Sequence, residues 1–334
     1  MKNLGLVLIS LVVSLGLVEV GSRLILPLQY GVAFVSLDGE PITPPIKSDL
    51  ELKPGITFRQ VAQEYDKIIS HTPGGFRGPT SPSEPEIIFI GDSFTYGTGL
   101  GDEETIPYLY CTALKLACVN LGRPGTATVR QLDILEHYLG KTGWRPKEVK
   151  LMMLVMTSTL MAGNDFNGNV EEWQEQNENP QSFEKTEENE RNGLLQGIVS
   201  QRKVILRHSN LARVIYYVYG SAVRANFSPK SAEKELEKAM KITQQQLERL
   251  DRLSKDLRFS YSVYIIHPIQ SLINNTYQQT YRSIFNMVPN KVVIDTAPAL
   301  LNSGSIDSYF YNMDGHLNPV GAKTVADYMA SLPR

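Results

Sequence analysis

The sequence is poor in cysteine and histidine, and it has no excess of positive charge. Its 334 residues include only two cysteines, Cys111 and Cys118, and five histidines. No histidine stands at ligand spacing near the cysteines, which argues against a zinc site. The formal net charge of −2 provides no basic field for a polyanion, so nucleic-acid binding is disfavoured. No glycine-rich phosphate loop of the P-loop or dinucleotide type occurs. We therefore expect neither a metal nor a cofactor.

The two cysteines leave two interpretations open. Their spacing places Cys111 on a helix and Cys118 at the start of the next strand, so in an exported domain they can form one disulfide. Otherwise they are two buried thiols that fill space in the core.

The main compositional anomaly is the apolar amino terminus. Residues 4–18 are aliphatic apart from glycine and serine, and with the residues that follow, the run reaches the ~20 residues that a spanning helix needs. Glu19 and Arg23 near its end are i,i+4 partners. A cleaved signal peptide is the alternative, but no small-x-small cleavage site follows. We expect residues 1–27 to be an uncleaved single-pass anchor in the membrane, and Lys2 favours a cytoplasmic amino terminus with the rest of the chain outside.

Residues 28–85 are punctuated by prolines and contain no long periodic helix. Short alternating pieces at 56–58 and 65–69 predict a hairpin. We interpret the whole segment as a collar or linker between the membrane and the main domain. Arg77, in a glycine-rich turn that precedes the first core strand, is interpreted as a structural arginine.

From residue 86 the chain alternates strands and helices. Five short apolar segments predict buried strands, at residues 86–90, 118–121, 149–156, 261–266 and 292–294. Helical spacing is found at residues 106–116, 129–139, 231–257 and 322–332. Strand-helix-strand units force parallel pairing with right-handed crossovers. The fold class we predict is therefore α/β, with a doubly wound, five-stranded parallel sheet in a domain that covers residues 86–334.

This pattern is interrupted at about 167–230. Residues 171–190 carry eight glutamates and one lysine with few aliphatic residues, a composition that predicts a mobile surface insertion without a core of its own. Residues 202–217 are more apolar and predict a helix that packs on the body or lies near the membrane.

Polar residues follow the predicted strands, at the edge where an open α/β sheet binds its ligands. Ser93 follows the first strand, Gly125 the second and Asn164 the third, while Asp314 and His316 lie in the loop before the last helix. A serine becomes a nucleophile when an imidazole accepts its proton and a carboxylate orients that imidazole. Asp314 stands two residues before His316, close enough for its carboxylate to reach the ring.

A developing negative charge on the attacked carbonyl needs hydrogen-bond donors. The backbone N–H groups of Ser93 and Gly125 and the side chain of Asn164 can supply them, with Gly122 as an alternative to Gly125. Taken alone, Asp92 and Ser93 could instead be a turn or a helix cap.

Other polar residues receive no catalytic role. We interpret His267, which follows the fourth strand, as structural. Asp165, Asp295 and Asp307 are given no function.

The four polar blocks, taken in order, resemble the signature of the SGNH (GDSL) hydrolase superfamily. They are Gly91-Asp92-Ser93, residues 120–125, Gly163-Asn164-Asp165, and residues 314–318. The resemblance covers the chain from about Glu86 to its end. It implies a flavodoxin-like three-layer α/β/α domain with esterase, lipase or acyltransferase activity. It also implies that Ser93 is the nucleophile and one oxyanion donor, that Gly125 and Asn164 are the other donors, and that His316 is the base.

One departure from the common family pattern concerns the carboxylate. The family usually has an aspartate three residues before the histidine, and Met313 occupies that position here. The spacing of Asp314 and His316 resembles the branch that contains polysaccharide acetyltransferases and related anchored proteins. An amino-terminal anchor followed by Gly75-Phe76-Arg77 is also similar to bacterial membrane-tethered members, many of which are implicated in modifying extracytoplasmic glycans.

The resemblance leads to one functional expectation and several alternatives. We expect a serine esterase of the bacterial cell membrane that acts outside the cytoplasm on O-acyl, above all O-acetyl, esters of a glycan. An O-acyltransferase to a sugar hydroxyl and a lipase or lysophospholipase are the enzyme alternatives. A non-catalytic glycan-binding or assembly protein that keeps the fold is the alternative from another class.

Overall fold

The computed structural model describes residues 2–25, 32–79, 82–155, 165–177, 209, 211–212, 214–215, 229–302 and 304–333. The chain divides into two compact units. The larger consists of Val32–Asn177 with Lys230–Arg334, and the smaller of Met1–Gly31 with Glu178–Pro229.

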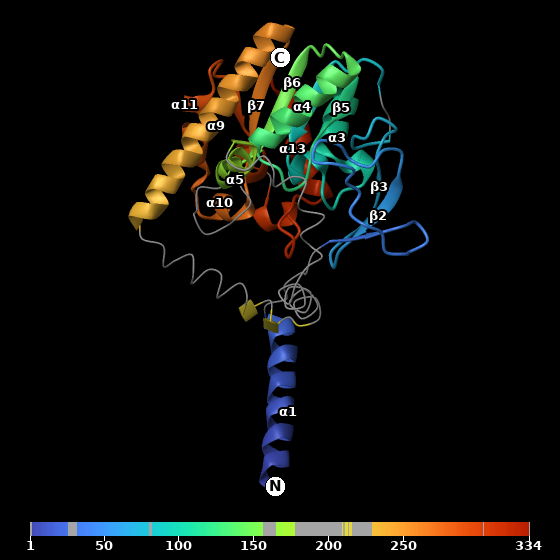
Figure 1. The fold of residues 1–334 in the computed structure, drawn as a ribbon, viewed down its shortest axis with the longest axis vertical. Coiled ribbons are helices and arrows are strands. Elements are labelled where there is room, and N and C mark those ends of the chain that lie inside the picture. The colour runs from blue at the N-terminus through green and yellow to red at the C-terminus, as the bar shows by residue number, and fades with distance from the viewer. Residues whose placement is uncertain are drawn as a thin grey trace. The chain divides into compact units, whose positions relative to one another are not determined.

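The larger unit is built around a parallel sheet of five strands in the order β5-β4-β6-β7-β8. Of these strands, Figure 1 labels β5, β6 and β7. The strands are β4 (Ile87–Gly91), β5 (Cys118–Asn120), β6 (Glu148–Leu154), β7 (Ser260–Ile266) and β8 (Val293–Asp295). Phe89 of β4 is paired with Asn120 of β5 on one side and Lys150 of β6 on the other. The predicted α/β fold with five parallel strands is confirmed. Since β4 and β5 are parallel neighbours, the turns that follow them lie at the same edge of the sheet.

Helices cover both faces of this sheet and make three layers, because the strand side chains alternate between two cores. In β4, Ile88 and Ile90 belong to one core and Ile87 and Phe89 to the other. Onto the first core pack α4 (Thr128–Thr142), α5 (Asp165–Asn177), α9 (Pro229–Leu257) and α11 (Tyr277–Met287). Onto the second pack α3 (Ile106–Leu114), α10 (Ile269–Ile273), α12 (Ala297–Leu301) and α13 (Pro319–Ser331).

Capping residues explain where two of these helices begin. Thr105 precedes α3, and its hydroxyl accepts the N–H of Tyr108 at 3.3 Å. Asn318 precedes α13, and its side chain accepts the N–H groups of Val320 and Gly321. This cap, with a proline in the first turn, starts the last helix three residues earlier than its apolar spacing predicts.

The amino-terminal part of the larger unit forms an antiparallel sheet of three strands, β1 (Ala33–Val35), β2 (Thr57–Val61) and β3 (Asp66–Ser70). The predicted hairpin is thus present as β2 and β3. Phe58 and Ile69 from the hairpin share a small core with Tyr96, which follows β4. These strands therefore pack on the main domain, as a simple linker would not.

A disulfide joins Cys111 of α3 to Cys118 at the start of β5. Of the two interpretations open for these cysteines, the disulfide is confirmed. Short helical segments complete the unit: α2 (Ser93–Tyr96), η1 (Asp102–Glu104) and η2 (Ile306–Tyr309).

Part of the acidic segment differs from the expectation of a mobile insertion. Residues 165–177 form α5, which places the buried Val170 in the first core. The expectation was wrong here because it rested on the high glutamate content, whereas one apolar face of the helix is enough for it to pack on the core. Most of the remaining insertion, with the helix predicted at 202–217, lies outside the described residues.

In the smaller unit, α1 covers Lys2–Ile25. Arg23 and Glu19 form the expected i,i+4 pair, with Nε and Oε1 2.8 Å apart. Within the part of the chain that the structure describes, no helix combines the length and the apolar character required to cross a membrane.

Candidate active site

Ser93 lies where β4 ends and the short helix α2 begins. The Asp92 carboxylate accepts the N–H of Phe94 at 2.9 Å and so caps α2. Burial raises the pKa of Asp92 to about 6, against the opposing effects of this hydrogen bond and of nearby His316. The interpretation of this turn as a helix cap is therefore correct for Asp92, while Ser93 takes part in a different contact.

Ser93, His316 and Asp314 form a hydrogen-bonded chain. The Oγ of Ser93 is 2.7 Å from Nε2 of His316, and Nδ1 of His316 is 3.1 Å from Oδ2 of Asp314. Because a carboxylate can only accept, Nδ1 donates to Asp314, and Nε2 is left to accept the Ser93 hydroxyl proton. The side chains of His316 and Asp314 are 21% and 12% exposed, respectively. This is the arrangement in which an imidazole can remove the proton of a serine.

The loop that carries His316 is closed by its own backbone. The N–H of Gly315 donates to the carbonyl of Tyr311 at 2.9 Å, and the N–H of Tyr311 donates to the carbonyl of His316 at 2.8 Å. The buried Leu317 anchors the end of the loop in the second core. Phe94, the residue after Ser93, also contacts the imidazole: the centres of the Phe94 and His316 rings are 4.9 Å apart. The loop thus sets the direction of the imidazole before any substrate is bound.

Asp314 has the carboxylate role in this geometry although it stands only two residues before the histidine. Met313, at the position where the family usually has its aspartate, directs its backbone N–H to Glu64. Burial alone would raise the pKa of Asp314, but hydrogen bonds from His316 and Tyr65 and the charge of His316 outweigh burial. The net result is a lowered pKa, which favours the carboxylate form that His316 needs.

The second block reaches the site through the turn that follows β5. The N–H of Arg123 donates to the carbonyl of Gly91 at 2.9 Å, and the side chain of Asn120 donates to the carbonyl of Thr95 at 2.8 Å. These contacts hold the turn against the segment that carries Ser93.

The two candidate glycines of this turn differ in their surroundings. A Cβ at Gly122 would lie 2.3 Å from the backbone nitrogen of Tyr96, so Gly122 is needed for close packing on α2. Gly125 has a φ of +75° and nothing within 4 Å of an added Cβ. Gly122 thus has a packing role, and the role of Gly125 as an oxyanion donor stays a prediction. Asn164, the third predicted donor, lies outside the described residues.

Helix α5, which starts directly after Asn164, is bound to the start of α4. Asn169 accepts the N–H of Val129 at 2.9 Å, and Glu172 accepts the N–H groups of Ala127 and Arg130, each at 2.8 Å. These bonds satisfy amides that a helix start leaves without partners. Hydrogen bonds therefore join the start of α4, which follows the turn of Gly125, to α5, which follows Asn164.

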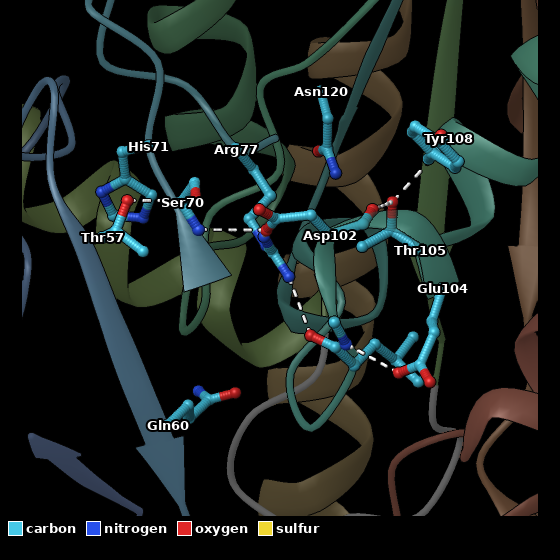
Figure 2. A network of polar contacts seen from close by, with 12 residues as sticks. Thr57, Gln60, Ser70, His71, Arg77, Asp102, Glu104, Thr105, Tyr108 and Asn120 are labelled. Atoms are coloured by element: carbon cyan, nitrogen blue, oxygen red, sulfur yellow. Dashed lines mark hydrogen bonds and ion pairs between the residues drawn. The ribbon is translucent and has the colours of Figure 1, made fainter. Parts of the chain in front are cut away.

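Arg77 belongs to the network of polar contacts shown in Figure 2. Its side chain is completely buried, forms an ion pair with Asp102, and donates to the carbonyl oxygens of Tyr96 at 3.2 Å and Leu100 at 2.8 Å. Burial lowers the pKa of Arg77 to about 10, which leaves it charged at neutral pH. The contacts are those of a structural arginine that holds the segment after α2, in agreement with its interpretation from the sequence.

His267 is buried, and its Nε2 lies 2.7 Å from Oδ1 of Asp295. The same oxygen of Asp295 accepts the N–H of Ala297 at the start of α12. This pair joins the ends of β7 and β8, so the structure gives Asp295 a structural contact that the sequence did not indicate. Among the described residues, no group of three or more His, Cys, Asp or Glu side chains could hold a metal ion.

Two residues that contact the triad were not predicted. Tyr65 and Glu64, at the end of the β2–β3 hairpin, hydrogen-bond to Asp314. Neither lies in a motif, and Tyr65 is 249 positions from Asp314. No sequence signal in the segment 28–85 indicated this contact.

No family model matches the chain, and no curated protein matches its sequence. Among solved structures it is similar to a protein from Desulfitobacterium hafniense described as lipolytic and of the G-D-S-L family, with 12% identity and a TM-score of 0.38, over 73% of this chain and 97% of the other. It is also similar to the acetylxylan esterase Axe2 of Geobacillus stearothermophilus, with 14% identity and a TM-score of 0.39, over 76% of this chain and 98% of the other.

A third similar structure is a carbohydrate esterase family 2 enzyme with a carbohydrate-binding domain from Corynascus thermopiles (Myceliophthora fergusii), with 12% identity and a TM-score of 0.39, over 90% of this chain and 86% of the other. Because these identities and TM-scores are low, the function proposed below rests on the geometry of Ser93, His316 and Asp314. The three proteins named here are described as a lipolytic protein of the G-D-S-L family, an acetylxylan esterase and a carbohydrate esterase.

Proposed function

We propose that this chain is a serine esterase of the SGNH type that cleaves O-acyl esters through an acyl-serine intermediate. One observation carries the proposal: the Oγ of Ser93 lies 2.7 Å from Nε2 of His316, whose Nδ1 lies 3.1 Å from the carboxylate of Asp314. A serine that is only structural has no need of an imidazole that is itself oriented by a carboxylate.

In the first half-reaction, Ser93 Oγ attacks the ester carbonyl while Nε2 of His316 takes the hydroxyl proton. The carbonyl becomes an oxyanion, for which the backbone N–H groups of Ser93 and Gly125 and the side chain of Asn164 are the proposed donors. The C–O bond to the alcohol then breaks, and His316 returns its proton to the leaving oxygen. Asp314 remains a carboxylate and stabilises the imidazolium.

In the second half-reaction, His316 takes a proton from water, and the resulting hydroxide oxygen attacks the acyl-serine. The ester bond to Ser93 breaks, its Oγ regains the proton from His316, and the carboxylic acid is released. If a sugar hydroxyl replaces water, the same steps transfer the acyl group to the sugar.

The test is covalent labelling by a fluorophosphonate probe, which reacts with an activated serine. The unchanged chain should be labelled, and Ser93→Ala should not. Ser331→Ala is a matched control, because Ser331 is an exposed serine on α13 whose hydroxyl bonds only locally, to Tyr328. Equal labelling of Ser93→Ala and the unchanged chain would refute the assignment.

As substrate we propose the O-acetyl ester of a glycan. The support is the spacing of Asp314 and His316, which resembles the branch of the superfamily that contains polysaccharide acetyltransferases. Acetate release from acetylated glycans should exceed fatty-acid release from lysophospholipid in parallel assays, and it should vanish in Ser93→Ala. Fatty-acid release alone would indicate a lipase, and acetyl transfer to an added sugar would indicate an acyltransferase.

We further propose that the catalytic unit acts outside the cytoplasm, attached to the membrane through residues 1–27. The disulfide between Cys111 and Cys118 supports this location, because disulfides form and persist mainly in oxidising compartments. The apolar composition of residues 4–18 supports the attachment. In intact cells, a thiol reagent added before denaturation should modify neither cysteine, and the chain should sediment with the membranes. Free thiols in the mature chain would contradict the proposed location.

A further inference from the structure

The end of the β2–β3 hairpin lies against the proposed triad. Tyr65 is 6% exposed, and its hydroxyl donates to Oδ2 of Asp314 at 3.0 Å. The same oxygen of Asp314 lies 3.1 Å from Nδ1 of His316. The hydrogen-bonded chain therefore extends beyond the three residues that the motifs identify, and runs from Tyr65 through Asp314 and His316 to Ser93.

Glu64 binds the backbone at Asp314. Its Oε2 accepts the N–H of Met313 at 2.8 Å and the N–H of Asp314 at 3.0 Å. Hydrogen bonds to a charged carboxylate are about twice as strong as neutral ones. Through Glu64 and Tyr65, the hairpin therefore binds both the backbone and the side chain of Asp314.

The hairpin is in turn attached to the segment that follows the nucleophile. Gln60 of β2 is 2% exposed, and its side-chain oxygen accepts the N–H of Gly99 at 2.8 Å. Tyr311 lies in the loop that carries His316. Its hydroxyl donates to the carbonyl of Gly99 at 2.8 Å, and its ring lies 4.9 Å from the ring of Tyr65. The hairpin thus contacts the loop of His316 on one side and the segment after Ser93 on the other.

A second attachment of the hairpin leads to the buried network around Arg77. The N–H of Ser70 at the end of β3 donates to Asp102 at 3.0 Å, a contact drawn in Figure 2. Lys67 pairs with Glu104 at 2.7 Å. Because both acceptors lie on η1, close after Gly99 in the chain, the hairpin has little freedom to move relative to the nucleophile.

We infer that Glu64 and Tyr65 are positioning residues for catalysis, which hold Asp314 so that it orients His316 toward Ser93. This inference rests on the proposed esterase function. Neither residue touches the reacting atoms, so both act on the rate of the chemical step through Asp314. The β2–β3 hairpin accordingly has a role in positioning the triad.

The test compares conservative variants by kcat and KM with 4-nitrophenyl acetate. Tyr65→Phe keeps the buried ring beside Tyr311 but lacks the hydroxyl, and should lower kcat about tenfold with KM changed less than twofold. Glu64→Ala should lower kcat to a similar extent, while Glu64→Gln, which keeps an acceptor oxygen, should restore most of it. Asp66→Asn is the matched control: Asp66 follows Tyr65 directly, but its side chain pairs with Arg59 within the hairpin, so kcat should not change.

A measurement without turnover separates this inference from the proposed function. Hydrogen exchange of the peptide that contains Met313 and Asp314 should be about tenfold faster in Glu64→Ala than in Asp66→Asn. Unchanged kcat and unchanged exchange in the Glu64 and Tyr65 variants of an active enzyme would overturn the positioning role and leave the esterase assignment intact. Faster exchange in a chain that neither turns over esters nor labels at Ser93 would refute the esterase function, and with it the catalytic meaning of this contact.

Discussion

Gly122 and Tyr96 approach so closely that a Cβ on the glycine would lie 2.3 Å from the tyrosine's backbone nitrogen. The contact presses the turn after β5 against the helix that begins with Ser93. The packing of the site therefore depends on the absence of a side chain at this position.

Gly122→Ala should accordingly destabilise the protein, because backbone atoms cannot move aside as a flexible side chain can. We expect a loss of about 3 kcal/mol in the free energy of unfolding. Gly125→Ala should cost only about 1 kcal/mol, since the added methyl meets nothing within 4 Å and the cost is that of a positive φ. Urea unfolding of both variants checks this, and equal losses would contradict the assignment of Gly122 to packing.

Asp314→Asn should impair catalysis far more than folding. An asparagine can present its N–H₂ group to Nδ1 of His316 and so favour the tautomer that cannot accept the Ser93 proton. We expect kcat for ester hydrolysis to fall on the order of 10³-fold to 10⁴-fold, which is the size of effect that the wrong histidine tautomer has in a serine protease triad.

The comparison for this variant is Asp307→Asn. Asp307 is exposed on η2 and close in sequence to the same loop. Its kcat for ester hydrolysis should equal that of the unchanged chain. A similar loss in both variants would show that a charge in this region, and not the orientation of His316, is what matters.

His71 makes stability depend on pH. Its Nδ1 donates to the carbonyl of Lys53 at 3.0 Å, and its Nε2 accepts the hydroxyl of Tyr96 at 2.9 Å. Burial lowers the pKa of His71 to about 4 despite the bond to Lys53. Between pH 6.5 and 4 the unfolded chain binds a proton that the folded chain does not, so stability is lost as the pH falls through this window.

The loss from this one group amounts to about 3 kcal/mol between pH 6.5 and pH 4. In His71→Gln, which cannot be protonated, the free energy of unfolding should fall less steeply over the same range, although it starts lower at about pH 7. Urea unfolding at several pH values across this range measures both slopes. Parallel slopes for the two proteins would show that His71 does not remain neutral when folded.

Much of this site could be predicted from local patterns. The buried strand before Ser93 and the polar turns that carry Gly125 and His316 can be recognised because strand periodicity and turn chemistry depend on neighbouring residues. The expectation that Ser93 and His316 meet, although 223 positions separate them, came from the resemblance of the four motif blocks, because α12 and η2 stand between β8 and the loop of His316.

Local patterns and the motif resemblance were thus sufficient for the five parallel strands and for the choice of Ser93, His316 and Asp314 as candidate residues, but they missed helices such as α5 and α11. They were not sufficient for three other features: which glycine packs on α2, whether Cys111 and Cys118 are bonded, and how Glu64 and Tyr65 hold Asp314. The physical reason is that these contacts join elements with no shared periodicity or motif. A hydrogen bond between residues 249 positions apart arises only when both elements have packed on the same core.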